Sequence, residues 1–320
     1  MLRPLLNWRS PAGPQARLSV LIFHRVMPEP DPLFPGEMHA CQFNAVCGWI
    51  KSWFNVLPLD QAVGRMAGAS LPARAACITF DDGYADNFRV ALPILQRHGL
   101  TATFFIATDF VDGGCMWNDS VVEAVRSSKC AVLDLSCLGL GCHATGSLGE
   151  KRRTIAHLVP EIKYWPAAQR ALATAQIAQL AHAGSPRDLM MRSPELVALR
   201  QAGMQIGAHT KSHPILALLD GEQARQEIRG SKLFLERVLG ERVGLFAYPN
   251  GKPGEDYTAQ TVDVVRSLDF DAACSTAWGT TGTGDDPFQI RRFTPWDTSQ
   301  LRFGVRMLGN YSKKSDQIGF

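Results

Sequence analysis

Seven short apolar runs, separated by longer stretches, are the feature that most limits what this chain can fold into. The runs are rich in β-branched and aromatic residues and cover residues 18–23, 76–80, 101–106, 204–208, 244–248, 270–274 and 289–293. Most are nearly continuously apolar, as expected for strands buried on both faces of a parallel sheet rather than half-exposed strands. Strands that alternate with helices indicate an α/β fold, either a barrel or a doubly wound sheet.

Helices are predicted between these strands. The segments with helical spacing of apolar residues are 43–54, 58–67, 86–98 and 221–239. The third ends at Gly99, and the fourth follows Asp220 and ends at Gly240, so each has a residue suited to its cap.

The stretch from about 115 to 199 interrupts this alternation. It contains a part rich in Gly and Cys and an Ala-rich helix predicted at 167–183, and we interpret it as a mostly helical insertion in a core spanning residues 18–311. The first 17 residues hold three prolines and are expected to form an N-terminal arm. Residues 312–320 are expected to form a polar tail.

Charge and cysteine content limit the class of protein and its location. The net charge of +3 lacks the basic footprint of nucleic-acid binders, so no nucleic-acid partner is expected. The eight cysteines form no C-x-x-C pair and fit a reducing compartment. No signal peptide is visible, and no run has the ~20 apolar residues of a membrane span, so we expect a cytoplasmic protein. Leu5, Leu6 and Trp8 leave membrane-surface association open, and the oligomeric state is open too.

Two adjacent carboxylates, Asp81 and Asp82, end the second apolar run and are followed by Gly83. An Asp-Gly turn at a strand end explains these residues without any function. In α/β folds, however, sites assemble at the carboxyl ends of strands. Consecutive strand residues point in opposite directions, so both carboxylates reach one site only if the chain bends here.

A pair of histidines, His209 and His213, ends the fourth apolar run. The spacing alone is a weak signal, and the position at a strand end is the stronger one. With Asp82 the two imidazoles would form a site of one carboxylate and two nitrogens, leaving positions open for water and substrate.

Two more strand ends carry candidate residues. Tyr248-Pro249-Asn250-Gly251 is either a simple turn or a pocket wall with a backbone N–H directed at a developing oxyanion. His24 ends the first run, and a single histidine in such a place is more often structural.

Together these motifs resemble the polysaccharide deacetylase (NodB-homology) family, carbohydrate esterase family four. The resemblance rests on TFDDGY at 79–84, HTKSH at 209–213 and FAYPNG at 246–251. It implies a distorted (β/α)7 barrel, one divalent metal ion and an N-acetylated glycan substrate. By resemblance, Asp81 is the catalytic base, Asp82, His209 and His213 hold the metal, and the Tyr248 N–H in the Tyr248-Pro249 turn contacts the oxyanion.

The chain departs from the commonest family pattern at two places. No histidine follows His213, so the usual acid of a C-terminal Leu-x-His motif is missing. The motif order is similar to that of the poly-N-acetylglucosamine deacetylase branch, in which an early Tyr-His-x-Val strand end provides the acid, and this implies His24. The arginine that commonly orients the catalytic Asp falls on Ala247, so we expect Arg291 or Arg292 to replace it and favour Arg292.

The resulting hypothesis is a hydrolase that removes N-acetyl groups from the amino sugars of a polysaccharide or glycan precursor of exopolysaccharide type. Zinc suits the three metal ligands, although Co²⁺, Ni²⁺ and Mn²⁺ fit nearly as well. Two other interpretations stay open. The same metal centre could hydrolyse a non-sugar C–N bond, or the barrel could be a catalytically inactive carbohydrate-binding protein.

Overall fold

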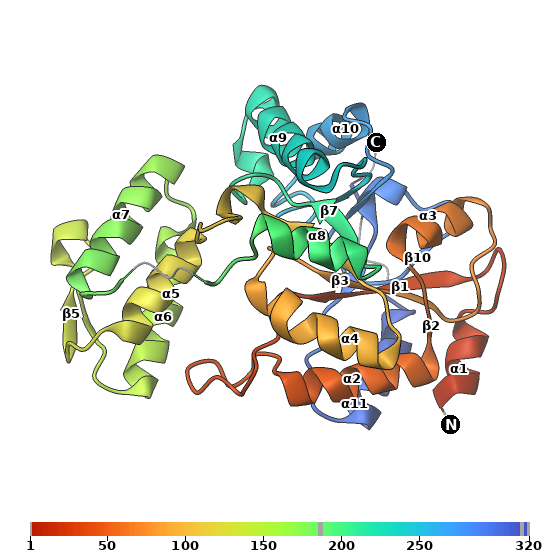
Figure 1. Cartoon of the computed structure of the whole chain (residues 1–320), viewed down its shortest axis with the longest axis horizontal. Helices are drawn as coiled ribbons and strands as arrows, with labels where there is room; N and C mark the ends of the chain where they lie inside the picture. Colours follow the sequence, from red (N-terminus) through yellow and green to blue (C-terminus); the bar gives the residue numbers. More distant parts are fainter. Residues whose placement is uncertain (1, 185–187, 314–316, 319–320) are drawn as a thin grey trace. The chain divides into compact units, whose positions relative to one another are not determined.

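The structure is a computed structural model that describes residues 2–184, 188–313 and 317–318. It divides into two compact units (Figure 1). Unit 1 comprises Met1–Glu29, Met38–Asp112 and Met191–Phe320, and unit 2 comprises Pro30–Glu37 and Gly113–Met190. We describe each unit by itself.

In the described part of unit 1, seven parallel strands form a nearly closed barrel. In spatial order they are β1 (Arg17–Phe23), β3 (Ala75–Phe80), β4 (Thr103–Ile106), β7 (Gln205–Ala208), β8 (Leu245–Ala247), β9 (Ala272–Cys274) and β11 (Arg292–Phe293). β11 pairs with β1, and a parallel bridge between Cys274 and Ile290 joins β9 to the residues before β11. This single bridge leaves the ring nearly closed, and the expected distorted (β/α)7 barrel is confirmed. Two short strands flank it, β2 (Asn55–Val56) on β3 and β10 (Thr281–Gly282) on β1.

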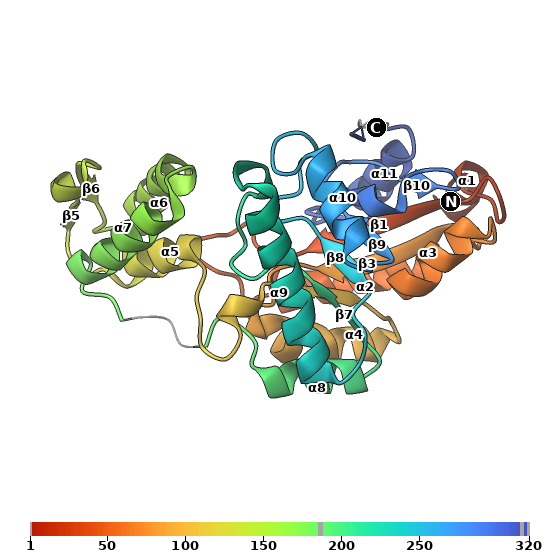
Figure 2. The same cartoon turned by 90° about the horizontal axis from the view of Figure 1, so that it is seen from above.

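Helices surround this sheet (Figure 2). They are α1 (Leu2–Arg9), α2 (Ala40–Trp53), α3 (Leu59–Ala67), α4 (Leu92–His98), α8 (Ser193–Gln201), α9 (Gly221–Leu239), α10 (Ala259–Ser267) and α11 (Gln300–Asn310), with a π-helical turn η1 (Asn87–Ala91) before α4 and 3₁₀ turns η2 (Thr108–Phe110), η4 (Leu216–Leu218) and η5 (Pro287–Gln289). The caps predicted for the fourth helical segment are present. Asp220 and Gln223 form a capping box, and Gly240 adopts the left-handed conformation.

Strand phase sorts the core of unit 1 into two clusters. Leu18, Val20 and Cys77 belong to the cluster that fills the barrel, whereas Ile78 and Phe80 belong to the cluster shared with the outer helices. The alternation follows from the period of two along a strand. It also decides which residues at the strand ends face the barrel interior.

The first 17 residues differ from the arm expected from the sequence. Residues 2–9 form α1, and the Leu6 side chain is fully buried in the outer core cluster. Leu2 and Leu6 lie four residues apart, so one turn of helix brings both to the same side. At the other end of the chain, Gln317 and Ile318 of the predicted polar tail hydrogen-bond to Gln289.

Unit 2 has a core of its own. Its elements are α5 (Trp117–Ser127), β5 (Val132–Asp134), the 3₁₀ turn η3 (Ser136–Leu138), β6 (Cys142–Ala144), α6 (Leu148–Lys163) and α7 (Ala167–Leu180). The segment Pro30–Glu37 joins this unit, and its Asp31 accepts two hydrogen bonds from Arg126, at 2.9 and 2.7 Å. The unit is mostly helical, and α8, which begins within the predicted insertion of about 115–199, belongs to unit 1.

No helix among the described residues is both long enough and apolar enough to cross a bilayer.

Candidate active site

Asp81 lies one residue beyond β3, on the phase that faces the barrel interior. There it contacts Arg292 of β11. Arg292 is the register partner of Val20 in the β1–β11 pairing, and Val20 faces the barrel interior, so Arg292 does as well. Two guanidinium nitrogens of Arg292 donate to the two oxygens of Asp81, both at 2.7 Å, and Arg292 Nε donates to the Ser275 carbonyl at 2.8 Å. Both side chains are buried. Three fixed bonds hold the guanidinium, so the Asp81 carboxylate has a fixed orientation.

The charge state of Asp81 is set by two opposing effects. Burial alone would raise the pKa of Asp81, but the guanidinium of Arg292 and the imidazole of His209 outweigh it and lower the pKa below its ordinary value. Asp81 is therefore held as a carboxylate. Of the two arginines expected near it, Arg291 pairs instead with Asp285 at 3.2 Å.

Asp82 reaches the same site through a bend in the backbone. Asp82 and Gly83 both have positive φ, 77° and 93°, a conformation that is costly for a residue with a Cβ. The bend turns the Asp82 side chain away from the phase it would have in a continuing strand. The two adjacent carboxylates thus reach one site, as the sequence requires for a shared function.

The side chains of Asp82, His209 and His213 meet at one point. Asp82 Oδ1 lies 3.4 Å from His209 Nε2 and 3.4 Å from His213 Nε2. His213 also has a positive φ, 55°, as does Thr210, whose hydroxyl accepts a hydrogen bond from the His213 N–H at 3.1 Å. Strained backbone on both sides of the cluster is typical of residues held for a function.

The chemistry of these three residues fits a divalent metal ion. Asp82 Oδ1 is buried and has no hydrogen-bond partner, although His209 Nε2 and His213 Nε2 each lie 3.4 Å from it. His209 Nδ1 donates to the Ala247 carbonyl at 2.7 Å, so in the neutral imidazole Nε2 has the lone pair that a metal ligand needs. Two ligands about 2.1 Å from a tetrahedral ion lie about 3.4 Å apart, which matches the observed separations.

The electrostatics differ between the two histidines. Burial alone would lower the pKa of His209, but the carboxylates of Asp81 and Asp82 outweigh it and raise the pKa above its ordinary value, so a metal ion would displace a proton when it binds there. Burial alone would raise the pKa of Asp82, but the imidazoles of His209 and His213 hold it below its ordinary value. Burial lowers the pKa of His213 to about 4, more than Asp82 raises it. At neutral pH, Asp82 is a carboxylate and His213 is neutral, the forms in which both ligate metals.

His24 lies one residue beyond β1, at the same end of the barrel. Its side chain is exposed, and it is close enough for its charge to act on Asp81, Asp82 and His213. Its backbone is held by Asn87, whose amide donates to the His24 carbonyl at 2.8 Å. Asn87 was not among the residues predicted for the site. It lies on the first turn after the motif at 79–84, and no local sequence pattern links an Asn at this position to the residues that follow β1.

The prediction for Tyr248 needs correction. Its backbone N–H donates to the Cys274 carbonyl at 3.1 Å as part of the β8–β9 pairing, so it is already occupied. Its hydroxyl donates to the Phe288 carbonyl at 3.0 Å, and its ring stacks on Tyr257. Pro249 is buried and has no N–H to offer. The next N–H of the loop belongs to Asn250, which has a φ of 58° and no acceptor among the described residues.

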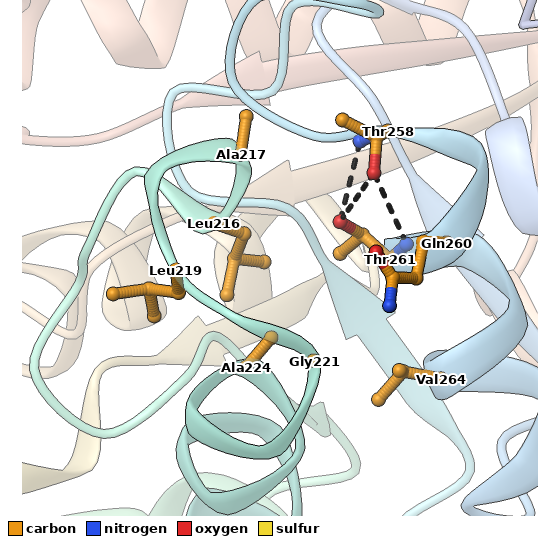
Figure 3. Close-up of a pocket in the computed structure, with 9 residues that line it drawn as sticks. All are labelled: Leu216, Ala217, Leu219, Gly221, Ala224, Thr258, Gln260, Thr261 and Val264. Atoms are coloured by element: carbon orange, nitrogen blue, oxygen red, sulfur yellow. Dashed lines mark hydrogen bonds between the residues drawn. The ribbon is translucent and has the colours of Figure 1, made fainter.

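A pocket of about 90 Å³ in unit 1 lies elsewhere, between η4 and the N-termini of α9 and α10 (Figure 3). Thr258 and Thr261 in its wall hydrogen-bond to each other in the N-terminal cap of α10. None of the predicted site residues lines this pocket, and we assign it no function.

A family model described as polysaccharide deacetylase matches residues 68–132 and 163–273, more than half of the chain. This chain belongs to the polysaccharide deacetylase family. The matched ranges contain Asp81, Asp82, His209 and His213, whereas His24 and Arg292 lie outside them. The resemblance carried by the three sequence motifs is thereby confirmed.

Other members of the polysaccharide deacetylase family and solved structures share parts of the chain or its fold. YxkH of Bacillus subtilis, named as a candidate polysaccharide deacetylase, is 27% identical over 93 residues, which cover 28% of this chain and only 32% of YxkH. The Streptococcus pyogenes deacetylase PplD, solved in complex with acetate, superposes with a TM-score of 0.60 at 16% identity, over 92% of this chain and 98% of PplD. IcaB from Ammonifex degensii superposes with a TM-score of 0.59 at 17% sequence identity, over 92% of this chain and 97% of IcaB. At such identities these two structures show a shared fold.

Proposed function

We propose that this protein is a metal-dependent hydrolase that removes N-acetyl groups from the amino sugars of a polysaccharide or glycan precursor of exopolysaccharide type. The observation that carries the proposal is that two adjacent carboxylates, Asp81 and Asp82, lie in one site but have different surroundings. Asp82 has a buried oxygen without a partner beside two imidazole nitrogens, and Asp81 is held as an oriented carboxylate by Arg292. Membership of the polysaccharide deacetylase family supports a polysaccharide as the substrate.

The proposed cofactor is one divalent ion, zinc in the first place, held by Asp82, His209 and His213. Once bound, it would polarise the amide carbonyl and lower the pKa of a water molecule in its coordination sphere. Two imidazoles and one carboxylate suit Zn²⁺, and Co²⁺, Ni²⁺ and Mn²⁺ remain outcomes for metal analysis.

Asp81 is the proposed general base. Its Oδ2 lies 4.0 Å from His209 Nε2, so it faces the metal ligands while Arg292 holds it. It takes a proton from the attacking water as the water oxygen bonds to the amide carbon. The negative charge that develops on the carbonyl oxygen needs a fixed donor, and we propose the Asn250 N–H for it in place of the Tyr248 N–H.

His24 is the proposed general acid. As the C–N bond breaks, the amine nitrogen takes a proton from the imidazolium, and acetate and a free amino sugar leave. The exposed position of His24 suits contact with a large glycan that stays largely outside the barrel. We also propose a cytoplasmic location, from the cysteine content alone.

The test is acetate release from a panel of N-acetylglucosamine oligomers and, in parallel, from non-sugar N-acetyl amides. We expect release from the oligomers and a loss of about 10²–10⁴-fold in kcat for Asp81→Asn. His157→Ala, an exposed histidine of unit 2, is the matched control and should keep full activity. Release from the non-sugar amides alone would favour a different amidohydrolase, and binding of oligomers without any acetate release would favour a carbohydrate-binding protein.

A further inference from the structure

Exposed apolar side chains of unit 1 gather at α1 and α11. The described residues of this unit expose seven large apolar side chains, and two of them, Leu218 and Leu233, lie elsewhere. The other five, each 50–74% exposed, are Leu5, Trp8, Trp296, Leu301 and Val305. We call these five residues, with Arg3, Arg9 and Arg302, the α1/α11 surface.

The two helices pack side by side. The Leu2 side chain occupies the space in which a Cβ at Gly304 would lie, so the helices approach closely there. Their inner sides bury Leu6, Phe303 and Met307 in the same core cluster. Leu5 and Trp8 are three residues apart and Leu301 and Val305 four, so each pair lies on the outer side of its helix.

Trp296 belongs to the same surface through a contact with α11. The guanidinium carbon of Arg306 lies 3.6 Å from the centre of the Trp296 ring. Arg306 also pairs with Asp297 at 3.0 Å, and that carboxylate is buried. An indole that is half exposed and fixed by a neighbouring cation is a rigid apolar anchor.

The charges of this surface have one sign. Arg3, Arg9 and Arg302 are exposed, and α1 and α11 contain no Asp or Glu. The same holds for α2, which packs on α1. The whole chain has nearly as many acidic as basic residues, 30 against 33, so a surface without carboxylates is not a consequence of composition.

We propose that the α1/α11 surface docks the protein on a bilayer that contains anionic lipids. Leucine, valine and tryptophan side chains would enter the headgroup region, while the three arginines pair with lipid phosphates and carboxylates. A second copy of the chain is a poorer occupant. In a two-fold symmetric interface the same patch meets itself, so the arginines would face arginines.

The docking proposal does not depend on the proposed function. The loop with Trp296 follows β11, at the barrel end where Asp81 and His24 lie. Trp8, in contrast, is two residues before Ser10, which hydrogen-bonds to Arg17 at the start of β1, so the α1/α11 surface also reaches the opposite end of the barrel.

Sedimentation of the full chain with lipid vesicles tests the proposal. The vesicles are phosphatidylcholine alone or phosphatidylcholine with phosphatidylserine. We expect sedimentation with the anionic vesicles that weakens as salt is added. The double variant Leu301→Ser, Val305→Ser and the triple variant Arg3→Gln, Arg9→Gln, Arg302→Gln should each lower the partition coefficient at least about tenfold. The matched control Leu218→Ser, Leu233→Ser removes the other two exposed large apolar residues among the described residues of unit 1 and should bind as wild type does.

Three results would overturn the proposal. The first is no sedimentation of wild type with either kind of vesicle. The second is an equal loss of binding in the control variant. The third is a wild-type dimer in size-exclusion chromatography that the Leu301→Ser, Val305→Ser variant converts to a monomer, since a second copy would then cover this surface.

Discussion

At the scale of single residues, two neighbouring arginines differ in what they contact. Arg292 forms the two bonds to Asp81, and Arg291 pairs with Asp285. We expect Arg292→Lys to lower kcat about 10–100-fold, because an ammonium cannot hold both carboxylate oxygens and the base loses its orientation. Arg291→Lys is the matched control and should stay within about twofold of wild type. Equal losses in both variants, with metal content unchanged, would mean that the bidentate contact does not matter for catalysis.

The role of His24 can be separated from general damage by the choice of substrate. We expect His24→Ala to lose about 10²-fold or more in amide hydrolysis but to keep the hydrolysis of an activated aryl acetate, whose leaving group needs no proton. Asn87→Ala, which removes the bond to the His24 carbonyl, should shift the amide-to-ester ratio in the same direction by a smaller amount. An unchanged ratio in His24→Ala would remove this residue from the acid role.

How far single residues could be predicted depended on how local their signals are. Asp81, Asp82, His209 and His213 each stand in a short motif at the end of a strand, and the structure brings all four together. Tyr248 was assigned wrongly because whether a backbone N–H is free depends on the pairing of β8 with β9, which the sequence does not display. The choice of Arg292 over Arg291 depended on which of the two side chains faces the barrel interior. Arg292 is the register partner of Val20, so both side chains lie on the same face of the sheet.

At the scale of elements, close packing of β7 against its neighbours decides which residues it can contain. A Cβ at Gly207 would lie 2.5 Å from ring carbons of Phe105 and 3.0 Å from the Leu245 carbonyl. We expect Gly207→Ala to lower the free energy of unfolding by about 1–3 kcal/mol, because the strands must move apart. Gly64→Ala in α3, where a Cβ meets nothing within 4 Å, should be neutral or slightly stabilising. Chemical denaturation measures both, and a neutral Gly207→Ala would show that the barrel adapts without cost.

Element positions were predicted better than element ends. The seven strands and α9 appear where apolar runs and caps placed them, because burial on both faces and capping are local demands. The β5–β6 hairpin was not predicted, since its strands lie in a segment rich in Gly and Cys and are largely exposed. The strands β8 and β9 are just as short, but they are buried and belong to apolar runs that can be recognised in the sequence.

At the scale of the whole molecule, the sequence did not indicate that Pro30–Glu37 belongs to unit 2. The link is made by Asp31 and Arg126, 95 residues apart, and such a long-range pair leaves no periodicity. The Arg126 guanidinium lowers the pKa of Asp31, more than burial raises it. Since the folded pKa is depressed, the stabilisation is present above the ordinary carboxyl pKa and is lost as pH falls through the folded value.

Asp31→Asn should therefore weaken unit 2 in a way that depends on pH. At neutral pH we expect faster amide hydrogen exchange in α5, with a loss of about 1–3 kcal/mol in local stability. The difference from wild type should shrink below about pH 4, where Asp31 begins to be protonated in the wild type as well. A difference that stays constant down to pH 2 would contradict an ionic contribution.

The central claim is that Asp82, His209 and His213 hold one metal ion on which deacetylation depends. The most direct measurement is titration of Zn²⁺ into metal-free protein, with bound metal and acetate release from an N-acetylglucosamine oligomer followed in the same samples. The account predicts one ion per chain, a rate proportional to occupancy, and neither binding nor activity in His209→Ala. Full activity of the metal-free protein, or a tightly bound ion in His209→Ala with undiminished acetate release, would contradict it.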